Sequence, residues 1–350
     1  MMEEKLEYRS GMNIPKPAQK FAIEQSLVTL YLKAGTKIEL STDPNYLYIH
    51  QPENNSCAAL KTIRSLVTVE PVAIEPQALS TIMNYQIPVV IFSQTGSFMG
   101  KIAVTSSIEE KIDLAQANMS QEMKLKIMRP SVWGNLRRCR RYLMRLRGES
   151  NSAVDIACEQ MEQVINRVYQ QESIAALLET FQQGQQLYYS VFGHLLKHEW
   201  GLKCHEPNSV VSRMLDFSYR LLEESVKIAV ENTGLNPTIG FWHTNRHQQQ
   251  ALIADLANEF KLYSELVVIR VLNKQVIVRE DFDGHGDKSG LPLSVVHALQ
   301  YSYMQKMNEQ FTYPGTKIKC SYEELLYLQA KQIAMLLCGK INEYYSPDLR

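Results

Sequence analysis

A change of hydrophobic pattern near residue 107 is the feature that most constrains the fold of this 350-residue chain. Before it, apolar and β-branched residues form short runs bounded by Gly, Pro and Asn, which is typical of β-strands. After it, apolar residues recur mostly at helical spacing. The pattern predicts an α+β, multidomain protein. We expect a small β-rich domain over residues 1–107 and a larger, all-α domain over residues 108–350.

The individual elements follow from the same periodicities. Strands are predicted at 27–32, 36–40, 46–50, 63–70, 72–74, 88–93 and 96–104, with a short helix at 77–83. Helices are predicted at 155–170, 173–198, 209–232, 247–263 and 322–342. Gly234 stands where a glycine is expected after a helix end. The stretch 264–292 is predicted to be irregular, with one short hairpin around residues 267–278.

Composition excludes several classes of protein. No apolar run reaches the ~20 residues that a bilayer-spanning helix needs, and the N-terminal residues lack the basic start and apolar core of a signal peptide. The six cysteines are scattered singly and form no CxxC pair, so neither a zinc site nor a disulfide framework is indicated. We therefore expect a soluble, cytoplasmic protein with reduced thiols and no membrane partner.

The charge of the chain is concentrated in one segment. Lysines and arginines balance aspartates and glutamates at 37 each, yet residues 121–148 carry nine basic residues and only one acidic residue. On a helix that begins at Leu136, most of these arginines fall opposite the apolar side. Arginine matches phosphate geometry, so the segment predicts DNA binding. The predicted DNA-binding residues are Lys124, Lys126, Arg137, Arg138, Arg141 and Arg145. The alternative is a solvated basic face without a ligand.

A second motif places a histidine before a helix that carries acidic residues. Residues 234–244 end one helix, form a turn and include His243, and the next helix carries Asp255 and Glu259. Asp255 lies three residues before Asn258, so the two occupy one helix face. Histidine and carboxylate oxygens can bind Mg²⁺ or Mn²⁺. Taken alone, however, a histidine before a helix is more often a structural hydrogen-bonding residue.

The order of these motifs resembles the family of CRISPR-associated adaptation integrases and endonucleases. The stretch 234–244 is similar to that family's "Gly-Leu-Asp-Pro…Gly-Phe-Leu-His" signature, and 254–261 is similar to its "Asp-Leu-Met-Glu…Phe-Arg" helix. Residues 216–222 resemble its "Ser-Phe-Gly-Tyr…Leu-Leu" segment, and 322–334 resemble its closing helix. In the N-terminal part, residues 87–92 before Gly96 and Gly100 also fit. The resemblance covers roughly residues 25–345.

The resemblance implies a fold, an activity and partners. It implies a β-rich dimerisation domain and a helical catalytic domain, which act as a homodimer beside a small companion adaptation protein. The implied reaction joins pre-spacer DNA to the repeat of a CRISPR array by transesterification. It would use Mg²⁺ or Mn²⁺ held by a glutamate, a histidine and a further acidic residue.

The chain departs from the family pattern at the implied metal site. His243 matches the ligand histidine and Asp255 the first acid of the helix, and these two are the candidate catalytic and metal-binding residues. The next acid of the family falls on Asn258, and an ungapped count from Tyr188-Tyr189 places Phe181 where the family has its glutamate. Glu179 and Glu259 are the nearby acids and the candidates for substitute ligands.

Two hypotheses therefore remain open from the sequence. The chain either takes part in integration as an enzyme, through a shifted ligand set or an active partner, or it is a DNA-binding paralogue without catalysis and without a metal cofactor. A third class is a DNA-binding protein unrelated to CRISPR, which genomic neighbours would identify. The sequence does not decide whether the protein is an enzyme.

Overall fold

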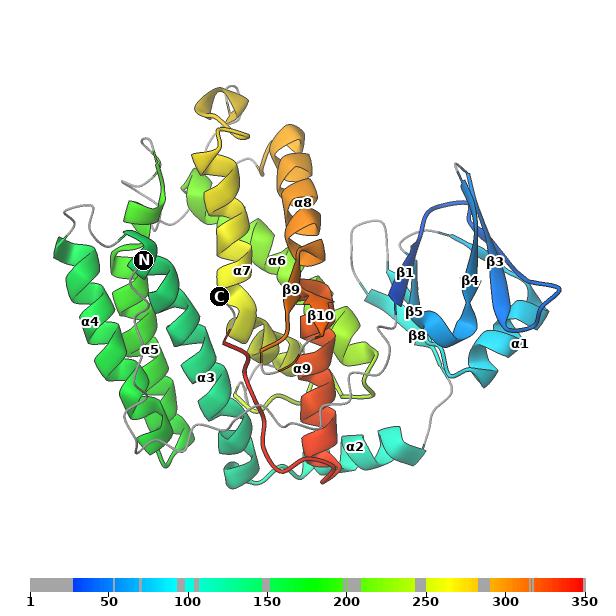
Figure 1. Cartoon of the computed structure of the whole chain (residues 1–350), viewed down its shortest axis with the longest axis horizontal. Helices are drawn as coiled ribbons and strands as arrows, with labels where there is room; N and C mark the ends of the chain where they lie inside the picture. Colours follow the sequence, from blue (N-terminus) through cyan, green and yellow to red (C-terminus); the bar gives the residue numbers. More distant parts are fainter. Residues whose placement is uncertain are drawn as a thin grey trace.

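A strand-rich part and a helical part make up the molecule, which the computed structural model describes over residues 28–348 except 53, 69–70, 93–97, 104–106, 147–151, 198–199, 201–208, 243–249, 283–289, 315 and 317. Figure 1 shows the strands to the right of the helices. The last described strand of the first part ends at Ile102, and helix α2 begins at Ser107. The predicted α+β class, with strands first and helices second, is confirmed.

Two four-stranded sheets form the strand-rich part. One has the order β1-β5-β7-β8, with β1, β5 and β7 parallel and β8 antiparallel to β7. The other has the order β4-β3-β2-β6. The bounds are β1 (Val28–Leu32), β2 (Lys37–Leu40), β3 (Tyr46–Gln51), β4 (Asn54–Ala59), β5 (Ile63–Thr68), β6 (Ala73–Ile74), β7 (Val89–Phe92), β8 (Phe98–Ile102) and helix α1 (Pro76–Asn84). Both sheets and α1 contribute to one apolar core, which includes Leu66, Ile38 and Ile82.

The helical part has one continuous apolar core. Its helices are α2 (Ser107–Ala117), α3 (Gln121–Leu143), α4 (Ser152–Arg167), α5 (Ile174–Ser190), α6 (Val210–Glu231), α7 (Ala251–Asn273), α8 (Leu293–Asn308) and α9 (Tyr322–Leu337). A small hairpin joins β9 (Gln310–Thr312) to β10 (Lys319–Ser321), and 3₁₀ turns lie at Leu60–Thr62, Met144–Leu146, Val168–Gln170, Phe192–Leu195 and Arg279–Phe282. Among the described helices, none combines the length and apolar character that a bilayer-spanning segment needs.

Local chemistry explains where several helices begin and end. Ser120, Ser173 and Ser209 accept a backbone N–H at the starts of α3, α5 and α6, which satisfies a donor that the helix itself leaves unpaired. Ser321 and Glu324 form a reciprocal capping box at the start of α9. Gly234 adopts the left-handed conformation (φ +73°) in the turn after α6, as expected for a glycine that follows a helix.

Helix α7 differs most from the sequence prediction. It continues to Asn273, so the predicted hairpin at 267–278 is wrong. A short run rich in valine and isoleucine suits a buried strand or a buried helix equally well, and burial decides between them. Residues Val267, Val268, Ile269 and Val271 are all buried inside the helical core. Helix α8, strand β4 and the end of α5 at Ser190 were likewise not predicted.

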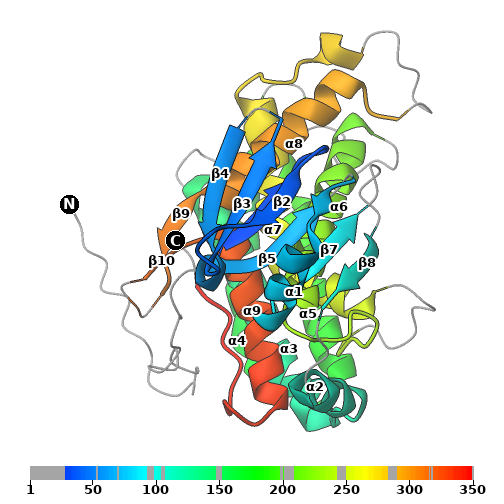
Figure 2. The same cartoon turned by 90° about the vertical axis from the view of Figure 1, so that its right-hand side faces the viewer.

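The strand-rich part packs against α6 and α9, as the view in Figure 2 shows. Val67 and Val90 are register partners on β5 and β7 and contact Ile228 of α6. Asn232 donates a hydrogen bond to Ser65 Oγ (2.9 Å), and Lys101 Nζ donates to the carbonyl of Glu231 (2.6 Å). On α9, Tyr31 donates to Glu323, and the Arg64 guanidinium lies 4.1 Å from the centre of the Tyr327 ring.

Candidate functional site

An aromatic pair occupies the position that the resemblance assigns to a metal-binding glutamate. Phe181 of α5 packs edge-on against Trp242, with ring centroids 4.7 Å apart and planes at 77°. This is a favourable arrangement of two aromatic rings. His243, the next residue in the chain, lies outside the described residues. At the position that the resemblance assigns to the glutamate, the structure therefore has an aromatic side chain packed against a second ring.

Asp255 serves a structural purpose at the start of α7. Its carboxylate is buried, and Oδ2 accepts the backbone N–H groups of Phe241 (2.7 Å) and Trp242 (2.8 Å). Gly240 makes this approach possible, because a Cβ there would lie 2.5 Å from Asp255 Oδ2. Charge-assisted hydrogen bonds of this kind fix the turn that leads to His243. One oxygen of this candidate ligand is thus already used by the protein backbone.

Neutral amides surround the second position at which a ligand is missing. The backbone carbonyl of Asn258 accepts a hydrogen bond from Asn135 Nδ2 (2.6 Å) of α3. Gln185 of α5 donates to Asn135 Oδ1 (2.8 Å). Beside them, an open hollow of about 460 Å³ is lined by Gln182, Gln185, Gln186, Tyr189 and Ser190. These side chains are uncharged at neutral pH, so this surface carries no carboxylate that would attract a divalent cation.

The two candidate substitute acids lie in other surroundings. Glu259 is 2% exposed. It accepts hydrogen bonds from Ser131 (2.8 Å), Tyr344 (2.7 Å), Ser346 (2.5 Å) and Gln329 (3.4 Å). Glu179 is exposed, and it sits two residues from Phe181, about 200° around α5. Within the described ranges, no group of three His, Cys, Asp or Glu side chains is placed to hold a metal ion. The described residues therefore do not fit the divalent metal that the family implies.

Helix α3 and the turn after it carry the predicted basic residues, and the structure corrects the placement of some of them. Arg138 is 3% exposed, so its prediction as a solvent-facing, DNA-binding residue is wrong. Its guanidinium donates to the carbonyls of Glu259 (2.6 Å) and Pro347 (2.8 Å). The reason is the segment after α9, which runs back along α3 and covers a face that periodicity alone leaves open (Figure 1).

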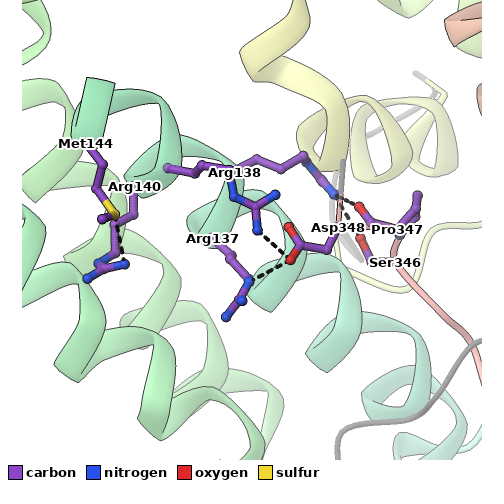
Figure 3. Close-up of polar contacts among 8 residues, drawn as sticks. Arg137, Arg138, Arg140, Met144, Ser346, Pro347 and Asp348 are labelled. Atoms are coloured by element: carbon purple, nitrogen blue, oxygen red, sulfur yellow. Dashed lines mark hydrogen bonds and ion pairs between the residues drawn. The ribbon is translucent and has the colours of Figure 1, made fainter. Parts of the chain in front are cut away.

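Arg137 and Arg141 meet a carboxylate from that same segment. Arg137 Nε lies 2.8 Å and Arg141 Nη2 2.5 Å from Asp348 Oδ2. Figure 3 shows Arg137 directed toward Asp348. Arg140 points away from Asp348 and toward α4, where it donates to the Cys158 carbonyl (2.9 Å) and pairs with Glu162 (2.7 Å).

The remaining predicted basic residues differ in their surroundings. Arg145 is exposed and its guanidinium lies 5.1 Å from the centre of the Tyr142 ring. Lys126 is exposed and pairs with Glu122 (3.1 Å), whereas Lys124 is partly buried. Arg145 and Lys126 thus lie on the surface, whereas Arg137 and Arg141 are paired with Asp348.

A buried acidic centre that was not predicted lies at Glu265, about two turns after Asn258 on α7. Glu265 is buried and accepts the hydroxyls of Tyr188 (2.9 Å), Tyr189 (2.6 Å) and Tyr219 (2.8 Å). Burial, and then the charge of Glu265, raise the pKa of all three tyrosines, so they remain neutral donors. The signal in the sequence is an isolated acid inside a long apolar run, because a buried acid needs hydrogen-bond donors.

Comparisons with known proteins agree with this architecture. The family model "CRISPR associated protein Cas1" matches residues 31–298. A CRISPR-associated endonuclease Cas1 from Leptospira interrogans is 28% identical over 239 residues, which cover 65% of this chain and 94% of that protein.

Two solved structures share the fold at low sequence identity. A casposase bound to integration product superposes with a TM-score of 0.72 at 16% identity, over 92% of this chain and 99% of that one. A partial Cas6-RT-Cas1–Cas2 complex gives 0.72 at 15% identity, over 93% and 100%. Because the family model matches well over half of its length, the chain belongs to the CRISPR-associated Cas1 family.

Proposed function

We propose that this Cas1-family chain binds pre-spacer DNA during CRISPR adaptation and supports integration without metal chemistry at its own Phe181–Asp255 site. Membership of the family supports the role in adaptation. Of the two hypotheses that the sequence left open, the contacts around Phe181 favour the non-catalytic one. Any transesterification in the assembly would then be carried out by a different protein.

The edge-on contact between Phe181 and Trp242 is the observation that carries this proposal. A missing ligand alone would leave a polar gap that water or a neighbouring acid could fill. Here an aromatic ring fills the position and packs against the residue that precedes His243. Rebuilding a cation site would therefore require this packed pair to separate, which costs apolar burial as well as a ligand.

Partners follow from the same family membership. A structural neighbour is a complex that contains Cas1 and Cas2, which supports a small companion adaptation protein for this chain as well. The casposase neighbour is bound to integration product, which supports contact with DNA. We propose that the chain works in the cytoplasm as a homodimer and that exposed basic residues, such as Lys126 of α3 and Arg145 of the turn after it, contribute to DNA binding.

A strand-transfer assay tests the proposal. The chain, without companions, is incubated with a labelled pre-spacer duplex and a plasmid carrying a CRISPR array, in Mn²⁺ and then in EDTA. We expect salt-sensitive DNA binding and no metal-dependent joining. The double variant Phe181→Glu, Asn258→Asp restores the two acids that the family pattern contains, and we expect it to gain Mn²⁺ binding in isothermal titration calorimetry.

A neutral variant is the matched control. Phe181→Gln, Asn258→Asp gives the helix a side chain of similar size to glutamate without its charge, so it should bind Mn²⁺ more weakly than the glutamate variant. Metal-dependent joining by the unmodified chain, abolished in His243→Ala, would overturn the non-catalytic proposal. Absence of DNA binding in every variant would overturn the DNA-binding part.

A further inference from the structure

We propose that Arg137 and Arg141 form a phosphate-binding site for DNA and that Asp348 of the same chain holds this site closed. The proposal deepens the DNA-binding function proposed above and rests on it. In this state a carboxylate occupies the place of a backbone phosphate. DNA would then compete with the C-terminal segment for one pair of arginines.

The two arginines have the geometry of an anion site. They are four residues apart on α3, so they project from one face of the helix. Both guanidiniums converge on a single oxygen, Asp348 Oδ2, from which their nearest nitrogens lie 2.8 and 2.5 Å away. The arginine side chains are 30% and 31% exposed, so a phosphate in solution can reach them. Buried Arg138, by contrast, is not available to any outside ligand.

Asp348 fills this site incompletely. Its second oxygen, Oδ1, is buried and has no hydrogen-bond partner among the described residues, although the first oxygen faces two arginines. A carboxylate that satisfied both guanidiniums well would use both of its oxygens. A phosphodiester presents two non-bridging oxygens, which share one negative charge and lie further apart than those of a carboxylate, so each arginine can have an oxygen of its own. Asp348 is therefore an imperfect ligand of the two arginines, and an anion that offers both of its oxygens can displace it.

The segment before Asp348 is anchored independently of the arginines. Tyr344 and Ser346 are buried and both donate to Glu259. Gly134 of α3 provides the space for this anchor, because a Cβ at that position would lie 2.1 Å from Ser346 Oγ. Asp348 lies two residues beyond Ser346, and its side chain is 20% exposed. Asp348 can therefore leave the arginines while Tyr344 and Ser346 stay in place.

Glu162 of α4, which pairs with another arginine of α3, provides an internal control. Glu162 pairs with Arg140, so Glu162→Gln removes the same unit of charge from a partner of the same helix. Arg140 remains fixed by the Cys158 carbonyl and points away from Asp348. The two variants Asp348→Asn and Glu162→Gln have the same net charge. A difference between them isolates the Arg137–Arg141 site from a general change of charge.

Duplex DNA binding is measured against salt concentration for the full-length chain, Asp348→Asn, Glu162→Gln and Asp348→Glu. We expect Asp348→Asn to bind roughly 3- to 10-fold more tightly at low salt, because one more phosphate contact steepens the log–log salt slope by about 0.9. Glu162→Gln and Asp348→Glu should behave like the unmodified chain. Adding Arg137→Ala and Arg141→Ala to Asp348→Asn should remove the gain. Equal affinities for Asp348→Asn and Glu162→Gln would overturn the proposal.

A second readout separates this proposal from the DNA-binding function. Melting temperature is compared in sodium phosphate and sodium chloride at equal ionic strength. Asp348→Asn should be stabilised by phosphate more than the unmodified chain is. Asp348→Ala, which also removes the carboxylate and keeps Tyr344 and Ser346, should show the same gain. No gain in either variant would overturn the proposal, whereas a phosphate gain without DNA binding by any variant would keep the site and overturn the DNA-binding function.

Discussion

The Phe181 position and the Arg137–Arg141 pair differ in what has become of the charge that the sequence analysis expects at each of them. Around Phe181 the expected charge is gone, and an aromatic contact with Trp242 stands in its place. On α3 the charge is retained and is covered by Asp348. A missing metal ligand can be regained only by mutation. Under the proposal above, the covered arginines become available when a phosphate displaces Asp348.

The largest effect is expected where the covered site is anchored. Glu259→Ala removes the acceptor shared by Ser131, Tyr344 and Ser346, all of which are buried. Unpaired buried hydroxyls each cost about 1–3 kcal/mol, so we expect the free energy of unfolding to fall by about 3 kcal/mol or more. Urea unfolding followed by circular dichroism measures it. A fall below about 1 kcal/mol would show that the C-terminal segment is held by other contacts.

A smaller effect is expected at the aromatic site. Phe181→Ala removes one ring of the pair, and since Phe181 is only partly buried we expect a loss of about 2 kcal/mol, below the range for a fully buried phenylalanine. Phe181→Leu is the matched control, because it keeps most of the apolar volume and should cost less. Equal stabilities of the two variants in thermal unfolding would mean that the pair adds no packing, which would weaken the contrast between the two sites.

The smallest effect is expected at Gly134, where a substitution tests how closely the C-terminal segment packs against α3. Gly134→Ala places a Cβ against Ser346 Oγ, and such overpacking costs about 1–3 kcal/mol. Alanine also favours the helix by up to about 1 kcal/mol, so a net loss of about 1 kcal/mol is expected. Gly100→Ala is a control, because a Cβ there meets no atom within 4 Å. Stability is measured by thermal unfolding, and a gain in Gly134→Ala would show that the C-terminal segment shifts without strain.

The sequence predicted the architecture better than it predicted the sites. The switch from strand runs to helical spacing was sufficient for the fold class, because both periodicities are local. The hairpin at 267–278 was wrong because Val267 and its neighbours lie in a helix that is buried inside the core, where branched apolar residues follow packing and not propensity.

The site predictions divide along the same line between local and distant information. The placement of Phe181 at the family's glutamate position rests on an ungapped count along α5 and stays a prediction, and the structure adds the contact of Phe181 with Trp242. The exposure of Arg138 was wrong because the atoms that bury it come from Pro347, 209 residues away in the chain. No periodicity on α3 carries that information. His243 lies outside the described residues, so its role as a ligand stays a prediction.

The carboxylate of Glu265 ties the stability of three helices together. Tyr188 and Tyr189 come from α5, Tyr219 from α6 and the acid from α7, so separating any one helix would expose a buried charge or strand a phenol without an acceptor. Partial opening of this region is therefore as costly as unfolding most of it. The middle of α7 should behave as a single cooperative unit whose amide protons exchange with solvent only in rare, large-scale openings of the domain.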